Sequence, residues 1–349
     1  MGPAVLDEAQ KEPSVFDKVK LAFDAGDIDF TVLLGSSRFL LIDRVRESLA
    51  GRAFIYDLWP LMPSEICCTS DGDPIVPLLD RLLMGEGLID SVLSNEPDRL
   101  VGEEDGTRRS AIEHLSRWGG MPELLRLDDE DRRLWLKSYQ QTFLERDLAD
   151  LTRLSDLAPF RKLQRLCMLR SGGLLSYTDL GRDASLGATT ARRYLEYLRL
   201  SYQVFLLQPF ARNLTSSTIK TPKLYWMDLG LLRQSTLQLG PLDGPLLETL
   251  VVGEVRKWID TLGRDVETTF YRTRSGLEVD LLLRTASGII GIEIKNRDRA
   301  LSKDCGLLRA VARALGEEWR GGLVVYRGSS LSALDRQQSI YAMPVHRLF

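Results

Sequence analysis

Residues 271–295, YRTRSGLEVDLLLRTASGIIGIEIK, constrain the fold of this chain more than any other stretch. The apolar runs LEVDLLL and IIGIEIK predict two antiparallel strands joined by a turn. Because side chains alternate along a strand, Glu278 and Asp280 share one face of the first strand. Glu293 and Lys295 share one face of the second strand for the same reason. Charges inside apolar strands are costly unless they are paired or bind an ion, so these residues mark a candidate site.

The predicted turn lies at Ser287-Gly288, and it brings the charged residues of the two strands to one place. Clustered carboxylates repel one another, and a divalent cation with oxygen ligands, such as Mg²⁺, relieves that repulsion. A lysine beside the metal would hold a water molecule or stabilise charge on a phosphate. The alternative is a surface strand pair with a Lys–Glu ladder, which needs no metal.

An acid, a turn and then Glu-X-Lys resembles the active-site hairpin of the PD-(D/E)XK nuclease superfamily. The resemblance implies that Asp280 is the first acid, Glu293 the second acid and Lys295 the lysine. Such nucleases often carry a further glutamate on the preceding helix, and Glu248 matches it. The resemblance therefore implies a catalytic set completed by Glu278, with Asp280 and Glu293 holding Mg²⁺.

The elements expected around this hairpin follow the same pattern. They are a helix at 245–262, a strand at 266–272, the hairpin, a helix at 303–316 and a strand at 321–328. Their order, αβββαβ, is the core order of the restriction-endonuclease-like fold, so 240–349 is predicted to be a nuclease-like domain.

The beginning of the chain carries a second group of motifs. Residues 3–10 form a short apolar segment that ends in Asp7 and Glu8, and a second strand is expected at 30–39. Judged alone, adjacent acids of this kind are typical of a solvated helix N-terminus, where they favour the helix dipole.

The segments LDEAQ, LLGSSRF, SLAGR and LWPL together resemble a family of prokaryotic AAA-type ATPases with a C-terminal domain of the DUF4143 kind. The resemblance continues through RWGGMPELL, YQQTFLERDL and KTPKLYWMDLGLL, and so covers nearly the whole chain. It implies that Asp7 and Glu8 are the Walker B acids. It also implies that Ser36 and Ser37 end the sensor strand and that Arg52 is an arginine finger, which would act across the boundary of a homo-oligomer.

The sequence contains no G-x-x-x-x-G-K-[ST] motif, which family members carry before the Walker B strand. That loop and its lysine cradle the phosphates of ATP, so ATP, the cofactor implied by the family, is not expected to bind this chain. ATPase activity would require such a loop upstream of Met1. We also expect the strand that bears Asp7 to have a bare edge or a substitute partner.

Residues 160–212 predict two helices, a Thr-Thr-Ala-Arg-Arg helix and a strand, the order of a winged helix-turn-helix. Nine basic residues and three acids give this segment a net charge of +6, a local signature of phosphate-backbone binding. Thr189, Thr190, Arg192 and Arg193 would lead the helix that contacts DNA. The alternative is a packing module whose arginines pair with acids elsewhere.

The remaining segments have simpler patterns. Ser176 or Thr178 is expected near a helix cap, and Asp228 is expected to cap a short helix rather than to act in catalysis. We expect a helical lid, with these segments: helices at 78–94, 108–118 and 131–151, loops at 69–77 and over the acidic run 103–106, and a break at Gly119-Gly120.

Bulk composition excludes several classes of protein. A net charge of −3 leaves no global basic surface, so DNA contact must be local. Four cysteines and two histidines without metal spacing argue against a zinc site and indicate reduced thiols in a cytoplasmic protein. No apolar run approaches about 18 residues, so no membrane partner is expected.

The predicted fold is a multidomain α/β protein with four parts. They are a partial AAA module at 1–65, a helical region at 66–157, a winged-helix module at 158–235 and the nuclease-like domain at 240–349. Three functions remain open: a Mg²⁺-dependent DNA nuclease, an ATP-driven regulator with a structural nuclease fold, and a non-catalytic DNA-binding protein. The missing phosphate loop weighs against the second.

Overall fold

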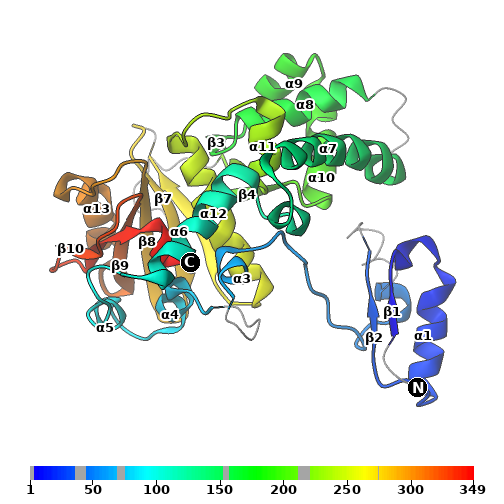
Figure 1. Cartoon of the computed structure of the whole chain (residues 1–349), viewed down its shortest axis with the longest axis horizontal. Coiled ribbons are helices and arrows are strands. Elements are labelled where there is room, and N and C mark those ends of the chain that lie inside the picture. The colour runs from blue at the N-terminus through cyan, green and yellow to red at the C-terminus, as the bar shows by residue number, and fades with distance from the viewer. Residues whose placement is uncertain (1–3, 36–44, 69–74, 152–156, 211–220, 274) are drawn as a thin grey trace.

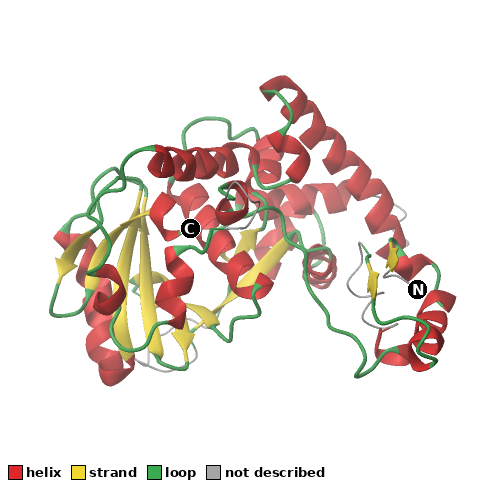
Figure 2. Ribbon diagram, turned by 60° about the horizontal axis from the view of Figure 1, so that its bottom comes forward, coloured by secondary structure: helices red, strands yellow, loops and turns green. Residues whose placement is uncertain are grey.

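The computed structural model describes residues 4–35, 45–68, 75–151, 157–210, 221–273 and 275–349. The chain forms a small N-terminal lobe and a large body, and an extended segment around residues 51–60 connects them (Figure 1). The body is built on one large mixed sheet with helices packed against it (Figure 2).

Among the described residues this sheet has nine strands, in the order β10-β11-β9-β8-β7-β6-β4-β5-β3. Their bounds are β3 Gly173–Leu174, β4 Val204–Pro209, β5 Lys223–Trp226, β6 Glu267–Arg272, β7 Glu278–Thr285, β8 Gly288–Lys295, β9 Trp319–Tyr326, β10 Ser332–Asp335 and β11 Ile340–Pro344. The β7–β8 hairpin is antiparallel, as predicted, while β8 and β9 are parallel. Its turn is at residues 286–287, one residue before the predicted position.

Two helices cover opposite faces of the hairpin. Side chains of α12 (Gly244–Thr261) join the core cluster that contains Leu281 and Ile292, whereas α13 (Gly306–Leu315) packs with Leu282. Both faces of the hairpin are buried, which explains why the sequence of each strand is a nearly continuous apolar run. The predicted order of a helix, three strands, a helix and a strand is therefore confirmed at the level of elements.

A β-bulge interrupts strict alternation in β7. Leu282 lies opposite Thr269 of β6, but Val279 lies opposite Tyr271, so three steps on β7 match two on β6. The extra residue falls between Val279 and Leu282, where Asp280 lies. The bulge interrupts alternation after Asp280, but Asp280 still lies with Glu278 as alternation predicts, because oxygens of the two carboxylates are within 4.8 Å of each other.

Three helices precede the sheet strands β4 and β5, namely α8 (Ala158–Leu169), α9 (Tyr177–Ala184) and α10 (Ala188–Leu200). The predicted cap of α9 is confirmed, because Ser176 Oγ accepts a hydrogen bond from Asp179 N at 3.2 Å. β4 pairs with β5 antiparallel and with β6 in parallel. The three-helix unit therefore shares a continuous sheet with the C-terminal strands.

The middle of the chain is helical, with one correction to the sequence analysis. Its helices are α3 Pro63–Ile66, α4 Leu78–Met84, α5 Asp90–Leu93, α6 Glu103–Trp118 and α7 Asp129–Leu151. The acidic run 103–106, expected to be a loop, is instead the first turn of α6, where carboxylates favour the helix dipole. The helix expected at 78–94 is two short helices separated at Gly85 to Gly87.

The Gly119-Gly120 turn docks on the segment that begins α11 (Leu229–Thr236). Asp228 caps α11 by accepting from Leu231 N at 2.9 Å, as predicted, and its second oxygen accepts from Gly120 N at 2.9 Å. A Cβ on Gly230 would lie 1.8 Å from the carbonyl oxygen of Trp118, so only glycine permits this approach.

The N-terminal lobe contains β1 (Ala4–Leu6), α1 (Ser14–Asp24) and β2 (Thr31–Leu33). β1 and β2 are parallel, and within the described part of the lobe β1 pairs with β2 alone; the bare edge or substitute partner stays a prediction. Ser36 and Ser37, predicted at the end of the second strand, lie outside the described residues.

The C-terminus ends in α14 (Val345–Leu348), which packs against α6. Within the described ranges, every helix is too short or too polar to span a lipid bilayer. All four cysteines are free.

Candidate functional site

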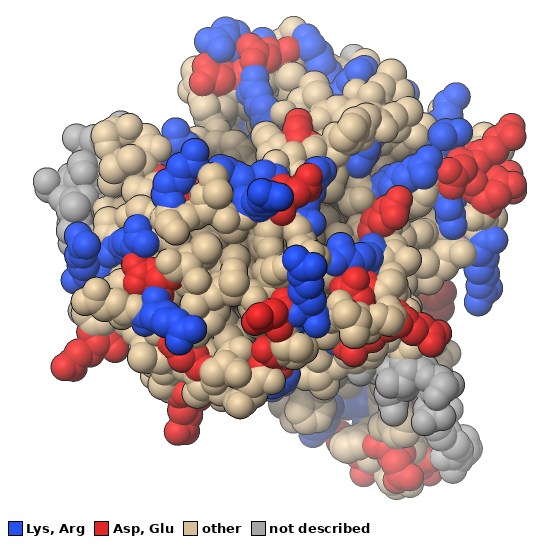
Figure 3. Space-filling view, turned by 60° about the vertical axis from the view of Figure 1, so that its left-hand side comes forward, with Lys and Arg blue, Asp and Glu red and all other residues tan. Residues whose placement is uncertain are grey.

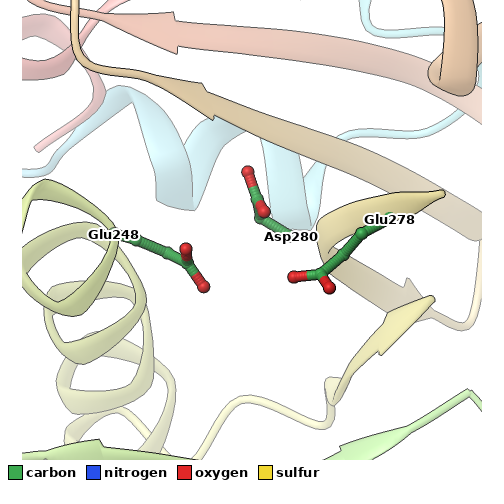
Figure 4. A group of neighbouring side chains, drawn as sticks. All are labelled: Glu248, Glu278 and Asp280. Carbon is green, nitrogen blue, oxygen red and sulfur yellow. The ribbon is translucent and has the colours of Figure 1, made fainter. Parts of the chain in front are cut away.

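Three carboxylates converge at the open end of the β7–β8 hairpin. Glu248 of α12 and Glu278 and Asp280 of β7 each offer an oxygen, and these oxygens all lie within 4.8 Å of one another. Figure 4 shows Glu248 projecting from its helix toward the two acids of the strand. Unscreened carboxylates at this separation would repel strongly, so the site must supply a counter-charge or protons.

Local structure accounts for the position of each acid. Asp243 caps α12 by accepting from Leu246 N at 2.8 Å, which places Glu248 in the second turn of the helix. Asp280 lies at the bulge in β7, and its Oδ2 accepts a hydrogen bond from Ile294 N at 2.7 Å. A side chain from β7 therefore binds the backbone of β8 next to Glu293.

A buried lysine supplies the counter-charge. Lys223, the first residue of β5, is 2% exposed, and its Nζ donates to Glu248 Oε1 at 2.6 Å. The same ammonium forms an ion pair with Glu278. Tyr225, two residues further along β5, donates its phenol hydroxyl to Glu248 Oε1 at 2.5 Å. Arg272 Nη1 donates to Glu278 Oε2 at 2.7 Å, so Glu278 is held from two sides.

Glu293 and Lys295 lie on β8 beside this cluster. The ammonium of Lys295 forms an ion pair with Glu293 Oε1. Glu293 is 5% exposed, and its other oxygen, Oε2, is buried and has no hydrogen-bond partner. A buried carboxylate oxygen without a partner is costly, which is the condition that a bound cation or proton relieves.

The ionisation of these groups reflects their burial. Burial raises the pKa of Asp280 well above its usual range, and the negative charges of Glu248 and Glu293 add to that rise. Burial also raises the pKa of Glu293. Burial acts to lower the pKa of Lys223, but the charges of Glu248 and Glu278 outweigh it and raise the pKa overall. Burial therefore favours the protonated forms of Asp280 and Glu293, whereas the neighbouring glutamates keep Lys223 charged.

Sequence reasoning identified the five acidic and basic residues of the hairpin and α12 but missed both β5 residues. The structure groups Glu248 and Glu278 with Asp280, while Glu293 and Lys295 form an adjoining pair. Lys223 carried the same signal as the hairpin acids, a charge within the buried run KLYW. Its partners lie 25 and 55 positions away, so only the tertiary structure reveals the pairing.

The residues matched to nucleotide binding lie in the N-terminal lobe. Asp7 and Glu8 directly follow β1, as expected, and Glu8 Oε2 accepts from Gln10 Nε2 at 2.6 Å. Arg52 Nε contacts Asp24 Oδ1, at the end of α1, at 3.1 Å. Arg52 is thus held by an acid of its own lobe.

The residues matched to DNA binding lie on α10. Thr189, Arg192 and Arg193 are exposed and Thr190 is half-buried. The guanidinium of Arg192 lies 5.7 Å from the ring centre of Tyr177. Within the described ranges neither Arg192 nor Arg193 is ion-paired with an acid.

Other arginines of the three-helix unit are paired within it. Arg170 and Arg182 pair with Asp183, and Arg199 Nη1 lies 2.8 Å from Glu196 Oε2. Arg212 lies outside the described residues. Asp183 and Glu196 belong to the same segment and are already counted in its net charge of +6, so these pairs leave that charge unchanged.

A separate cavity of about 320 Å³ lies between residues 58–61 and the helices α7 and α8. Its lining is largely apolar and includes Trp59, Met168 and Trp226. None of the charged residues of the hairpin site lines it, so it is not part of that site.

Three family models match the chain. A model for the AAA domain matches residues 2–67, one for a domain of unknown function (DUF8612) matches 109–242, and one for another domain of unknown function (DUF4143) matches 243–348. The three matches cover the N-terminal lobe, the part from within α6 through the three-helix unit to α11, and the hairpin domain, and residues 68–108 lie outside the matched ranges.

Two curated relatives come from mycobacteria. The uncharacterized proteins Rv2008c of Mycobacterium tuberculosis and Mb2031c of Mycobacterium bovis are each 28% identical to this chain over 302 residues. The aligned region covers 84% of this chain, which spans 58% of the length of each relative.

Among solved structures, protein VC1899 from Vibrio cholerae aligns over 93% of this chain and 88% of its own, with 13% identity and a TM-score of 0.20. A TM-score this low carries no argument about the fold. The family models do carry one: residues 2–67 match an AAA domain and residues 243–348 match a DUF4143 domain, which supports the predicted likeness to AAA-type ATPases with a C-terminal DUF4143 domain.

Proposed function

We propose that the C-terminal domain is a metal-dependent nuclease that hydrolyses DNA phosphodiester bonds. The observation that carries the proposal is the convergence of Glu248, Glu278 and Asp280 beside the Glu293–Lys295 pair. This is the residue set that the resemblance to PD-(D/E)XK nucleases implies. The order of helices and strands around the hairpin supports the same assignment.

The donor set fits a divalent metal. Every donor is a carboxylate oxygen, the ligand type that Mg²⁺ and Mn²⁺ prefer. Asp280 and Glu293 would hold the ion with help from Glu248, and the unpartnered Glu293 Oε2 has a free position for it. When bound, the metal would polarise a phosphoryl oxygen and lower the pKa of a water molecule.

Lys295 would act on the substrate as a charged hydrogen-bond donor rather than as a base. Burial acts to lower the pKa of its ammonium, but the charges of Glu293 and Asp280 outweigh it and raise the pKa overall. The ammonium therefore keeps its proton at neutral pH. Its side chain is 27% exposed, which leaves it accessible to a phosphate from solution. In this position it would stabilise negative charge that develops on the phosphate.

The three-helix unit would bind DNA. The order α8, β3, α9, α10, β4, β5 is that of a winged helix, and Arg192 and Arg193 project from α10 as exposed charges. The basic surface would be local, because on the face seen in Figure 3 Lys and Arg side chains are interspersed with Asp and Glu. Phosphate contacts by two arginines would then make binding strongly salt-dependent.

A second candidate function rests on Lys223. A buried ammonium that neutralises Glu248 and Glu278 is also how an inactive, purely structural site would be built. In that case the domain would serve an ATP-driven regulator or a non-catalytic DNA-binding protein.

Cleavage of supercoiled DNA tests the proposal. With Mg²⁺ or Mn²⁺ the purified chain should nick DNA, and EDTA should stop it. Lys295→Ala should reduce the rate by about 100-fold or more, because it removes a donor aimed at the developing charge. Lys303→Ala, at an exposed lysine of the same domain, is the matched control and should cleave normally. Absence of cleavage by the wild-type chain with either metal would favour the structural alternative.

A further inference from the structure

The ammonium of Lys223 lies where a cation bound to the acidic cluster would lie. It bridges Glu248 and Glu278, two of the three acids whose oxygens lie within 4.8 Å of one another. Two aromatic rings complete its surroundings, with the centre of the Phe270 ring at 5.6 Å and that of Tyr225 at 5.9 Å. Ring faces attract cations, so the two glutamates and the two rings all favour a positive charge at this point.

We propose that Lys223 is an exchangeable internal cation, which holds the acidic cluster closed to metal until a divalent ion displaces it. This inference rests on the proposed metal site and adds the regulation of that site. The proposed ion at Asp280 and Glu293 would also take Glu248 and Glu278 as ligands, and a metal bound to these two glutamates requires the space and the charges that the ammonium now uses. Metal binding and the two lysine ion pairs are therefore mutually exclusive.

A second observation points to a cation beyond the lysine. Glu293 Oε2 is buried without a partner, although Lys295 binds the other oxygen of the same carboxylate. The lysines together therefore leave one buried anionic oxygen unsatisfied. A divalent ion could reach several carboxylates at once, whereas an ammonium has only three donors.

The place of Lys223 in the fold connects the metal site to the three-helix unit. Lys223 begins β5, which pairs with β4 and β3 of that unit, while the acids belong to α12 and β7. Displacing the lysine side chain therefore requires a change at β5, a strand that pairs with the unit proposed to bind DNA. DNA contact and metal entry would be coupled through β5.

Manganese affinity tests the proposal without reference to activity. Lys223→Met should bind Mn²⁺ at least tenfold more tightly than the wild-type chain in calorimetry, because the competing charge is gone. Lys257→Met is the matched control, since Lys257 is also 2% exposed and pairs with a glutamate elsewhere on α12. That variant should bind Mn²⁺ like the wild-type chain. Adding Glu248→Gln to Lys223→Met should remove the gain.

A measurement on the wild-type chain covers the case in which Lys223→Met fails to fold. Acylation of lysines, followed by mass spectrometry, should spare the buried Lys223 without metal and modify it at saturating Mn²⁺. A Lys223 that stays protected while Mn²⁺ saturates the site would overturn the proposal. So would equal affinity in the wild-type chain and Lys223→Met, or no binding by either at millimolar Mn²⁺.

These outcomes separate the inference from the proposed nuclease. Tight Mn²⁺ binding by Lys223→Met without DNA cleavage by any variant would support the exchange and overturn the nuclease. Cleavage by a wild-type chain whose Mn²⁺ affinity does not depend on Lys223 would support the nuclease and overturn the exchange.

Discussion

A buried ion pair in α12 contacts the segment that leads to the N-terminal lobe. Glu254 is 4% exposed and accepts an ion pair from Lys257 at 2.7 Å, and Lys257 Nζ also donates to the Leu61 carbonyl at 3.2 Å. Burial raises the pKa of Glu254 to about 7 from an ordinary value of 4.5. Its Oε2 has no partner, which favours the protonated form further.

Glu254 should make stability fall as pH rises. The unfolded chain ionises this group near pH 4.5 and the folded chain only near 7, so rising pH favours unfolding across that window. A shift of this size is on the order of 3 kcal/mol. In Glu254→Gln the difference between the unfolding free energies at pH 5 and pH 8, measured with urea, should shrink accordingly.

Glu317→Gln, at an exposed glutamate, should leave that pH difference unchanged. A Glu254→Gln chain whose stability still falls as steeply as that of the wild-type chain would assign the pH dependence to other buried acids, with Asp228 as the nearest candidate.

At the scale of elements, the close docking of α6 on α11 depends on two glycine-containing turns. Gly119 and Gly120 pass beside Asp228, and Gly230 lies against the end of α6. One aspartate serves both elements, because Asp228 caps α11 and binds Gly120 N. The motifs RWGGMPELL and MDLGLL are therefore two halves of one structural contact.

Gly230→Ala should destabilise the protein by about 3 kcal/mol, because its Cβ would lie 1.8 Å from the Trp118 carbonyl oxygen and separate α11 from α6. Gly240→Ala is the control, since a Cβ there meets no atom within 4 Å. Its unfolding free energy should stay within about 0.5 kcal/mol of the wild-type value. Equal midpoints for the two variants in urea would show that the docking is adjustable.

At the scale of the whole molecule, the segment between lobe and body exposes several large apolar side chains. Phe54, Tyr56 and Leu58 are 89%, 80% and 96% exposed. The body begins where this segment is anchored, by the Tyr202 hydroxyl donating to Asp57 Oδ1 at 2.5 Å and by Leu61 N donating to Gly120 O at 2.7 Å.

Brief digestion with chymotrypsin should therefore cut first after Phe54 or Tyr56, since the protease needs an accessible aromatic residue in an extended segment. The expected product is one stable C-terminal fragment that begins at residue 55 or 57, identified by mass spectrometry. Replacing both aromatic residues by Ser should slow that cut and leave the thermal midpoint of the body unchanged. A first cut inside the body would contradict this division.

The sequence by itself determined the local features. Apolar runs carrying isolated charges predicted the hairpin, and Ser176 and Asp228 were identified as caps because a cap depends on residues three positions apart. The order of elements around the hairpin followed from the same periodicity. The acidic run 103–106 was misassigned because acids suit both loops and the first turn of a helix.

Only the tertiary structure decided which charges meet. The bulge at Asp280 depends on pairing with β6, and Lys223 reaches Glu248 and Glu278 across gaps of 25 and 55 positions. A strand pattern encodes which side chains are buried but not which distant partner neutralises them. Burial makes every such charge costly, and the pairing that offsets this cost exists only once the sheet and α12 have assembled.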